Sequence, residues 1–140
     1  MNLNIDQESR LPLPTTIYRI LGDETKRLST DISTAQAITF NFRDPTYTAE
    51  NGGFHPVEIR LEQIDGRWKM IYITDFQFVG FPFPELIKAI DVCFGTGRLF
   101  QFGLQVLAKF QMREVFELFI RNFITYYELG AYEVDISIER

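Results

Sequence analysis

The stretch "VEIRLEQIDGRWKMIYITDFQFVG", residues 57–80, decides the fold because it has the pattern of two β-strands joined by a tight turn. Apolar and charged residues alternate from 57 to 62, which is typical of a strand with one buried face. Asp65-Gly66 is a dipeptide strongly favoured in two-residue hairpin turns. We therefore predict a hairpin whose second strand is central and covered on both sides, or presents an apolar face to another molecule. Its two faces would be Trp68, Met70, Tyr72, Phe76 and Phe78 on one side, and Ile71, Ile73 and Val79 on the other.

The N-terminal segment predicts a short helix on an irregular arm. Residues 1–14 are expected to form an extended or frayed arm, because Pro12 and Pro14 remove backbone donors. "TTIYRILG", residues 15–22, offers a threonine cap, an apolar stripe and a terminal glycine, which together predict a helix. The polar residues 23–35 would then connect this helix to the main body.

Three further segments predict strands of the same sheet. Alternation over residues 36–43 predicts a strand, followed by a loop over 44–56. "IDVCFGTGRLFQF", residues 90–102, predicts a strand, a glycine-rich turn and a second strand, after a helical turn that begins at Pro84. Residues 132–139 alternate again and predict the last strand.

A long amphipathic helix is predicted from about residue 105 to residue 129, where apolar side chains recur at helical spacing before Gly130. The predicted fold class is α+β: a mostly antiparallel sheet of about five or six strands, with this helix packed on one face and a short N-terminal helix. We expect one domain over 1–140, in which 1–35 form the arm and short helix and 36–140 form the main body.

Charge and composition exclude some functions. The formal net charge of -5 argues against nucleic acid and anionic lipid as partners. The densest basic run, from Arg10 to Arg27, is interleaved with Asp23 and Glu24, which favours a solvated face. A single cysteine fits a reducing compartment, and neither a signal peptide nor an apolar run long enough to span a bilayer is present. We therefore expect a soluble cytoplasmic protein without contact to a membrane.

The polar candidates for a site are His55 and a few carboxylates. His55, the only histidine, could act as a base or ligand with Asp44, Glu58 or Asp75 as partner, although a structural role in the loop is the more frequent arrangement. Asp75 and Asp91 could form a carboxylate pair or lie separately in water at strand ends. No zinc spacing occurs, so we predict neither a metal nor a cofactor. A Cys93–His55 catalytic pair is disfavoured by the apolar neighbours of the cysteine.

The aromatic candidates lie in "FQFVGFPFP", residues 76–84, where prolines would stiffen the loop. Core packing under the long helix is the more frequent use of such residues. The alternative is a surface that holds aromatic rings against a partner. The residues concerned are Phe76, Phe78, Phe81 and Phe83.

Four phrases, "FNFRDP", "GGFHPVEI", "YITDF" and "PEL…IDVCF", resemble the bacterial family called domain of unknown function 2787, over roughly residues 37–139. The resemblance implies a bacterial cytoplasmic protein, in a family found largely in marine gamma-proteobacteria and often among mobile-element genes. It implies no activity, cofactor or catalytic residue.

Two functions remain in competition. The first is a non-enzymatic interaction module that binds a protein partner or itself through aromatic surface or a sheet edge. The second is a small-molecule or nucleotide-binding domain, with an enzyme left open, whose pocket would be lined by aromatic residues and by Asp75, Asp91 or His55. The aromatic residues of that predicted pocket are Tyr47, Phe76, Phe78 and Phe81.

Overall fold

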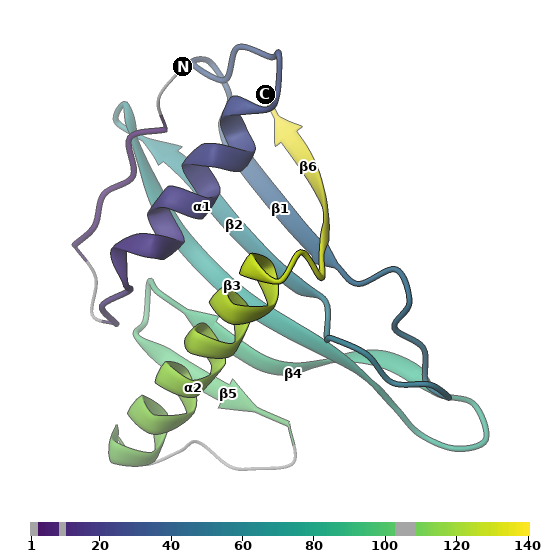
Figure 1. The fold of residues 1–140 in the computed structure, drawn as a ribbon. Coiled ribbons are helices and arrows are strands. Elements are labelled where there is room, and N and C mark those ends of the chain that lie inside the picture. The colour runs from purple at the N-terminus through teal and green to yellow at the C-terminus, as the bar shows by residue number, and fades with distance from the viewer. Residues whose placement is uncertain (1–2, 9–10, 103–108) are drawn as a thin grey trace.

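The computed structural model describes residues 3–8, 11–102 and 109–140, and within them the chain forms one antiparallel sheet of six strands and two helices (Figure 1). The strand order is β5-β4-β3-β2-β1-β6, and every neighbouring pair is antiparallel. The prediction of a mostly antiparallel α+β sheet with a short N-terminal helix is confirmed. The elements are α1 Thr15–Lys26, β1 Ala37–Arg43, β2 Val57–Ile64, β3 Arg67–Val79, β4 Glu85–Cys93, β5 Arg98–Gln101, α2 Lys109–Glu128 and β6 Glu133–Glu139.

The β2–β3 hairpin has the predicted turn. Asp65 and Gly66 both adopt positive φ, +54° and +78°, as a type I′ turn requires at its two central positions. Ile64 and Arg67 close the ladder on either side of the turn. This hairpin forms the middle of the sheet, because β3 also pairs with β4 and β2 also pairs with β1.

A bulge reverses the faces that alternation predicts for β3. The register with β2 shifts between Arg60 and Leu61, which leaves Ile71 as an extra residue on β3. Met70 and Ile73 consequently both belong to the core, whereas the hydroxyl of Tyr72 donates a 2.6 Å hydrogen bond to Glu58 on the opposite face. The predicted grouping of Tyr72 with Trp68 and Met70 is therefore wrong, because one extra residue moves every later side chain to the other face.

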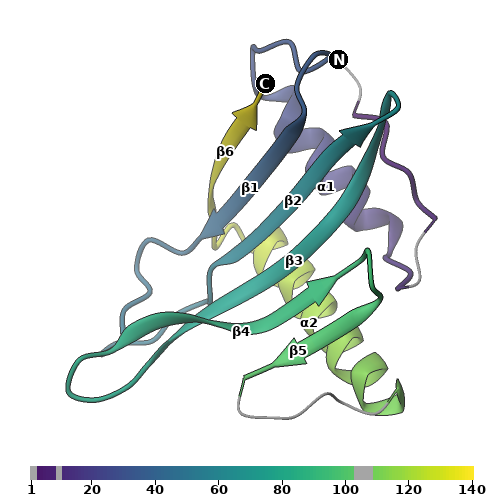
Figure 2. The ribbon, with the colours of Figure 1, turned by 180° about the vertical axis from the view of Figure 1, so that it is seen from behind.

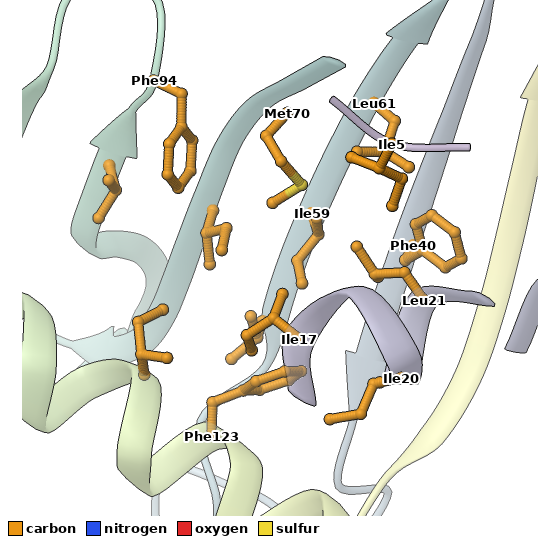
Figure 3. Packing of buried hydrophobic residues seen from close by; sticks show 14 of the residues in the cluster. Ile5, Ile17, Ile20, Leu21, Phe40, Ile59, Leu61, Met70, Phe94 and Phe123 are labelled. Atoms are coloured by element: carbon orange, nitrogen blue, oxygen red, sulfur yellow. The ribbon is translucent and has the colours of Figure 1, made fainter. Parts of the chain in front are cut away.

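The core lies between the sheet and the helices. Figure 1 shows α1 and α2 in front of the strands. Figure 2, which views the molecule from behind, shows the strands in front of the two helices. The ring of Phe123 in α2 meets that of Phe42 in β1 edge-on, at 4.9 Å between centroids. Figure 3 shows how side chains from α1, α2 and the strands meet there, among them Ile17, Leu21, Phe40, Ile59, Met70 and Phe123.

Helix α1 is longer than its sequence predicts. It continues past Gly22 to Lys26, and its first residue follows Pro14, with no side-chain cap. The buried carboxylate of Glu24 accepts a hydrogen bond from the hydroxyl of Tyr127, so a contact with α2 stabilises the added turn. The predicted end at Gly22 is wrong because this tertiary contact outweighs the low helix propensity of glycine.

The described part of the N-terminal arm is extended and pairs with β3. Ile5 forms a parallel bridge with Trp68, and the N–H of Asp6 donates to the carbonyl of Trp68 at 2.8 Å. Ile5 and Leu11 are both buried in the core. The arm therefore covers apolar surface at this end of the sheet.

The C-terminal elements agree with the sequence in part. Residues 85–90, next to the predicted helical turn at Pro84, belong to strand β4 instead. The start of the helix predicted near residue 105 lies outside the described residues. Helix α2 ends before Gly130, which has φ +75° as predicted for a glycine after a helix.

Candidate functional site

The carboxylate of Asp44 anchors the loop of residues 44–56. Its Oδ1 accepts hydrogen bonds from the backbone N–H of Thr46 at 2.9 Å and from the Thr46 hydroxyl at 2.6 Å. Its Oδ2 accepts a third hydrogen bond, from the N–H of Phe54 at 3.0 Å. These bonds, the Thr46 hydroxyl first, hold the pKa of Asp44 below its usual value. Asp44 therefore has a structural role that places Phe54 and His55 beside β3.

Gly53 lets the loop pass close to this carboxylate. Its φ is +137°, and a Cβ there would lie 2.8 Å from Oδ2 of Asp44 and 2.9 Å from Cα of Tyr47. We expect Gly53→Ala to lower the free energy of unfolding by about 2 kcal/mol, measured by urea denaturation. Gly52→Ala is the control, because Gly52 has φ +71° with no atom within 4 Å and is expected to lose only about 1 kcal/mol. Equal losses in the two variants would contradict the close approach.

His55 and Asp75 form a hydrogen-bonded pair where this loop meets β3. Nδ1 of His55 lies 3.0 Å from Oδ2 of Asp75, and Oδ1 of Asp75 accepts the N–H of Ile90 at 2.9 Å. Because an ionised carboxylate only accepts hydrogen bonds, Nδ1 carries the hydrogen, and Nε2 of a neutral ring is an acceptor. The Asp75 side chain is 11% exposed and that of His55 is 39% exposed. The pair thus fixes the imidazole orientation while leaving the ring accessible.

Both residues line a cavity of about 290 Å³ between the sheet, the loop and α2. This volume lies at the lower end of the range for small-molecule pockets. Most of the wall is aromatic or aliphatic. Apart from the His55–Asp75 pair, its polar side-chain groups are the amides of Gln101 and Asn122 and the hydroxyls of Tyr126 and Tyr132. The lining residues are Gly53, Phe54, His55, Val57, Asp75, Ile90, Gln101, Val115, Leu118, Phe119, Asn122, Phe123, Tyr126 and Tyr132.

Asp91 lies on the other face of the sheet. Its Oδ1 accepts a 2.6 Å hydrogen bond from the hydroxyl of Thr74. Thr74 and Asp75 are consecutive on β3, so their side chains point to opposite faces. The structure therefore separates Asp91 from the His55–Asp75 pair, and the expected site with both carboxylates is wrong for this reason.

Tyr47 connects the loop to the far part of β3. The N–H of Phe78 donates to the hydroxyl of Tyr47 at 3.0 Å, and the two rings lie 5.2 Å apart. The Tyr47 ring also lies 5.4 Å from that of His55, while Phe76 is half-buried opposite Lys88 of β4. None of the four aromatic residues of the predicted pocket is among the described residues that line the cavity; these four are Tyr47, Phe76, Phe78 and Phe81.

Phe81 and Phe83 lie at the tip of the β3–β4 hairpin, where the Phe81–Pro82 peptide bond is cis. Figure 2 shows this tip beyond the ends of the other strands. Phe81 is 97% exposed and Phe83 is 85% exposed. The interpretation that these two phenylalanines fill the core is therefore wrong, because the long strands carry the turn away from the helices.

Cys93 and His55 are also kept apart. Cys93 pairs with Tyr72, whose side chain lies on the face opposite the cavity. Hydrogen bonds with Thr96 lower the pKa of the Cys93 thiol, which is half-buried. In the part of the chain that the structure describes, no three His, Cys, Asp or Glu side chains lie close enough to hold a metal ion. No helix in the described ranges is long and apolar enough to cross a bilayer.

The two amide side chains of the cavity, Gln101 and Asn122, were not identified from the sequence. Asn122 had a signal: it follows Phe119 by three residues and precedes Tyr126 by four, so it lies on the apolar stripe of the helix. A polar residue on such a stripe indicates that the helix face packed against the sheet includes a polar contact or site. Gln101 had no comparable signal, because its position depends on how β5 pairs with β4.

Solved structures share this fold over nearly the whole chain. The hypothetical protein VC0508 from the Vibrio cholerae VSP-II pathogenicity island is 32% identical, with a TM-score of 0.88 over 98% of this chain and 99% of the other. The conserved hypothetical protein VC1805 from the V. cholerae pathogenicity island VPI-2 is 32% identical, with a TM-score of 0.73 over 93% of this chain and 98% of the other. VC1805 is described as sharing structural homology with the human P32 protein.

No curated protein matches the chain. The family described as "Protein of unknown function (DUF2787)" matches residues 15–137, which include α1, α2, β1 to β5 and all but the last two residues of β6. This match confirms the resemblance seen in the loop and strand phrases. The chain therefore belongs to the DUF2787 family.

Proposed function

We propose that the protein is a non-enzymatic interaction module that binds another protein through the tip of the β3–β4 hairpin. The observation that carries the proposal is the exposure of two large rings at one turn, 97% for Phe81 and 85% for Phe83. Burial of a phenylalanine side chain contributes about 1.5–3 kcal/mol. Because both rings are exposed to water, a partner that buries them would gain this free energy of burial for each ring.

Other apolar side chains extend this surface. Five of the eight exposed large hydrophobic residues in the described ranges lie between residues 81 and 102. They follow one edge of the sheet: two lie at the tip, one on β4 beside it, and two on or just after β5, which pairs with the end of β4 farther from the tip. We call this set the aromatic surface: Phe81, Phe83, Leu86, Phe100 and Phe102.

The form of the tip defines what the partner must offer. Two rings on a narrow turn are convex, so the partner needs a concave apolar site. The chain itself has one, an apolar groove of about 480 Å³ between α2 and the arm residues Pro12, Leu13 and Pro14. A second copy of the chain is therefore the first partner to test.

The described lining of the cavity offers His55 no Ser, Thr or Cys nucleophile, which argues against catalysis through a covalent intermediate on such a side chain. An oriented His–Asp pair can act as a base for a Ser, Thr or Cys nucleophile. Among the described residues that line the cavity there is no Ser, Thr or Cys. Cys93 lies on the opposite face of the sheet.

We expect the protein to self-associate as its concentration rises, measured by sedimentation equilibrium. The double variant Phe81→Ser, Phe83→Ser should weaken this association about 100-fold. The reason is the loss of about 3 kcal/mol of ring burial. Leu129→Ser is the control, because Leu129 is 71% exposed at the end of α2, away from the aromatic surface. A protein that stays monomeric at high concentration, whatever the variant, would contradict self-association.

A second candidate function is the binding of a small molecule in the cavity beside His55 and Asp75. The specific observation in its favour is an oriented imidazole in a largely apolar hollow of about 290 Å³. This function requires none of the aromatic surface, so the two candidates can be tested separately.

A further inference from the structure

Aromatic rings surround the cavity from several directions. The rings of Phe54 in the loop and Tyr126 in α2 lie 4.4 Å apart, and Phe119, Phe123 and Tyr132 complete the wall. Aromatic rings offer their faces and edges to flat, unsaturated ligands. A planar ring therefore fits this lining better than a flexible chain does.

The charges of the cavity disfavour an anionic ligand. The described lining residues include no Lys and no Arg, and their one carboxylate is that of Asp75. Both oxygens of Asp75 are already used, one by the N–H of Ile90 and the other by His55. A phosphate or carboxylate would enter a largely apolar hollow with no cation to compensate it. A cationic ligand would compete with His55 for Asp75.

Several polar groups of the lining remain available to a neutral ligand, among them the hydroxyls of Tyr126 and Tyr132. Nε2 of His55 has no hydrogen-bond partner among the described residues, and neither do the side-chain amides of Gln101 and Asn122. Each amide offers both a donor and an acceptor, and the neutral imidazole offers an acceptor at Nε2. The edge of a heteroaromatic ring with N–H and C=O or ring-nitrogen groups complements such a set.

We infer that the cavity binds an uncharged planar heteroaromatic molecule of the nucleobase class. This inference rests on the second candidate function, small-molecule binding, and is independent of the aromatic surface. The ring lies among the aromatic side chains, a ring N–H donates to Nε2 of His55, and the amides of Asn122 and Gln101 bind the remaining polar edge. Asp75 is a positioning residue that sets the tautomer and orientation of His55.

Titration calorimetry of the full chain with adenine, uracil, AMP and toluene tests the inference. We expect saturable binding of adenine or uracil, at least tenfold weaker binding of AMP because of its phosphate, and weaker binding of toluene, which has no polar edge. Asn122→Ala and His55→Phe should each weaken binding of the base about tenfold, the effect of one lost hydrogen bond. Glu114→Ala is the matched control, because Glu114 is exposed on the same helix and does not line the cavity.

The outcomes separate the inference from the function on which it rests. If toluene binds as well as the bases and Asn122→Ala has no effect, the cavity binds ligands but the nucleobase class is wrong. If AMP binds more tightly than adenine, the charge argument is wrong. If none of the four compounds binds, both the inference and the second candidate function fail. The thermal midpoints of the ligand-free variants show whether each variant still folds. A variant that folds normally but binds the base more weakly has lost a contact with the ligand, and the two substitutions lie on different elements, α2 and the loop.

Discussion

Replacing Phe42 by alanine is expected to lower the free energy of unfolding by about 4 kcal/mol, as for a large side chain that is removed from a packed core. Phe42 has no exposed surface and connects the sheet to the second helix. Its ring meets the ring of Phe123 at 4.9 Å, that of Tyr127 at 6.0 Å and that of Tyr132 at 6.1 Å, each edge-on. The substitution removes these contacts and leaves a cavity that the rigid strand cannot close.

Urea denaturation of the wild type and the variant measures this loss. Phe100→Ala is the control, because Phe100 also belongs to a strand but is half exposed, and we expect it to cost less than about 1 kcal/mol. A loss for Phe42→Ala no larger than the loss for Phe100→Ala would show that α2 does not pack on β1 as described.

Asp44→Ala is expected to lower the free energy of unfolding by about 3 kcal/mol at neutral pH, because three hydrogen bonds to one buried carboxylate are lost. Denaturation midpoints give the value. Asp135→Ala is the matched control, since Asp135 is an exposed strand aspartate 3.7 Å from Arg43, and exposed ion pairs contribute about 0–1 kcal/mol.

The effect of Asp44 should depend on pH in a defined direction. Its pKa is lower in the folded protein than the usual 3.8, so its charged form stabilises the fold above the unfolded pKa. The stabilisation is lost as pH falls through the lowered folded pKa. We therefore expect the difference in stability between wild type and Asp44→Ala to narrow between about pH 5 and pH 3. A constant difference over this range would contradict the role of the carboxylate.

Local patterns predicted most of the strands. Alternation located β1, β2 and β6, and the chemistry of Asp65-Gly66 determined the turn between β2 and β3. The faces of β3 could not be predicted, because the bulge at Ile71 depends on its pairing with β2 rather than on its own residues. The true end of α1 also escaped the sequence, since it depends on a contact between Glu24 and Tyr127, 103 residues apart.

The candidate sites were predicted less well than the fold. Asp75 was one of the partners named for His55 from the sequence, and the structure pairs these two residues. Asp91 was grouped with them, yet strand alternation places it on the opposite face, with Thr74 as partner. The exposure of Phe81 depends on how far β3 and β4 extend beyond the helices. This extension cannot be predicted from a local sequence pattern, because it depends on where the helices pack on the sheet.

The most direct test of the proposed function is to place a photoreactive phenylalanine analogue at position 81 and to irradiate cells that express the chain. We expect a protein adduct, of twice the mass of the chain if the partner is a second copy and of another mass if it is a different protein. The same analogue at position 129, an exposed site away from the tip, should give no adduct of that mass. No adduct at position 81, or the same adducts at both positions, would contradict an interaction through the hairpin tip.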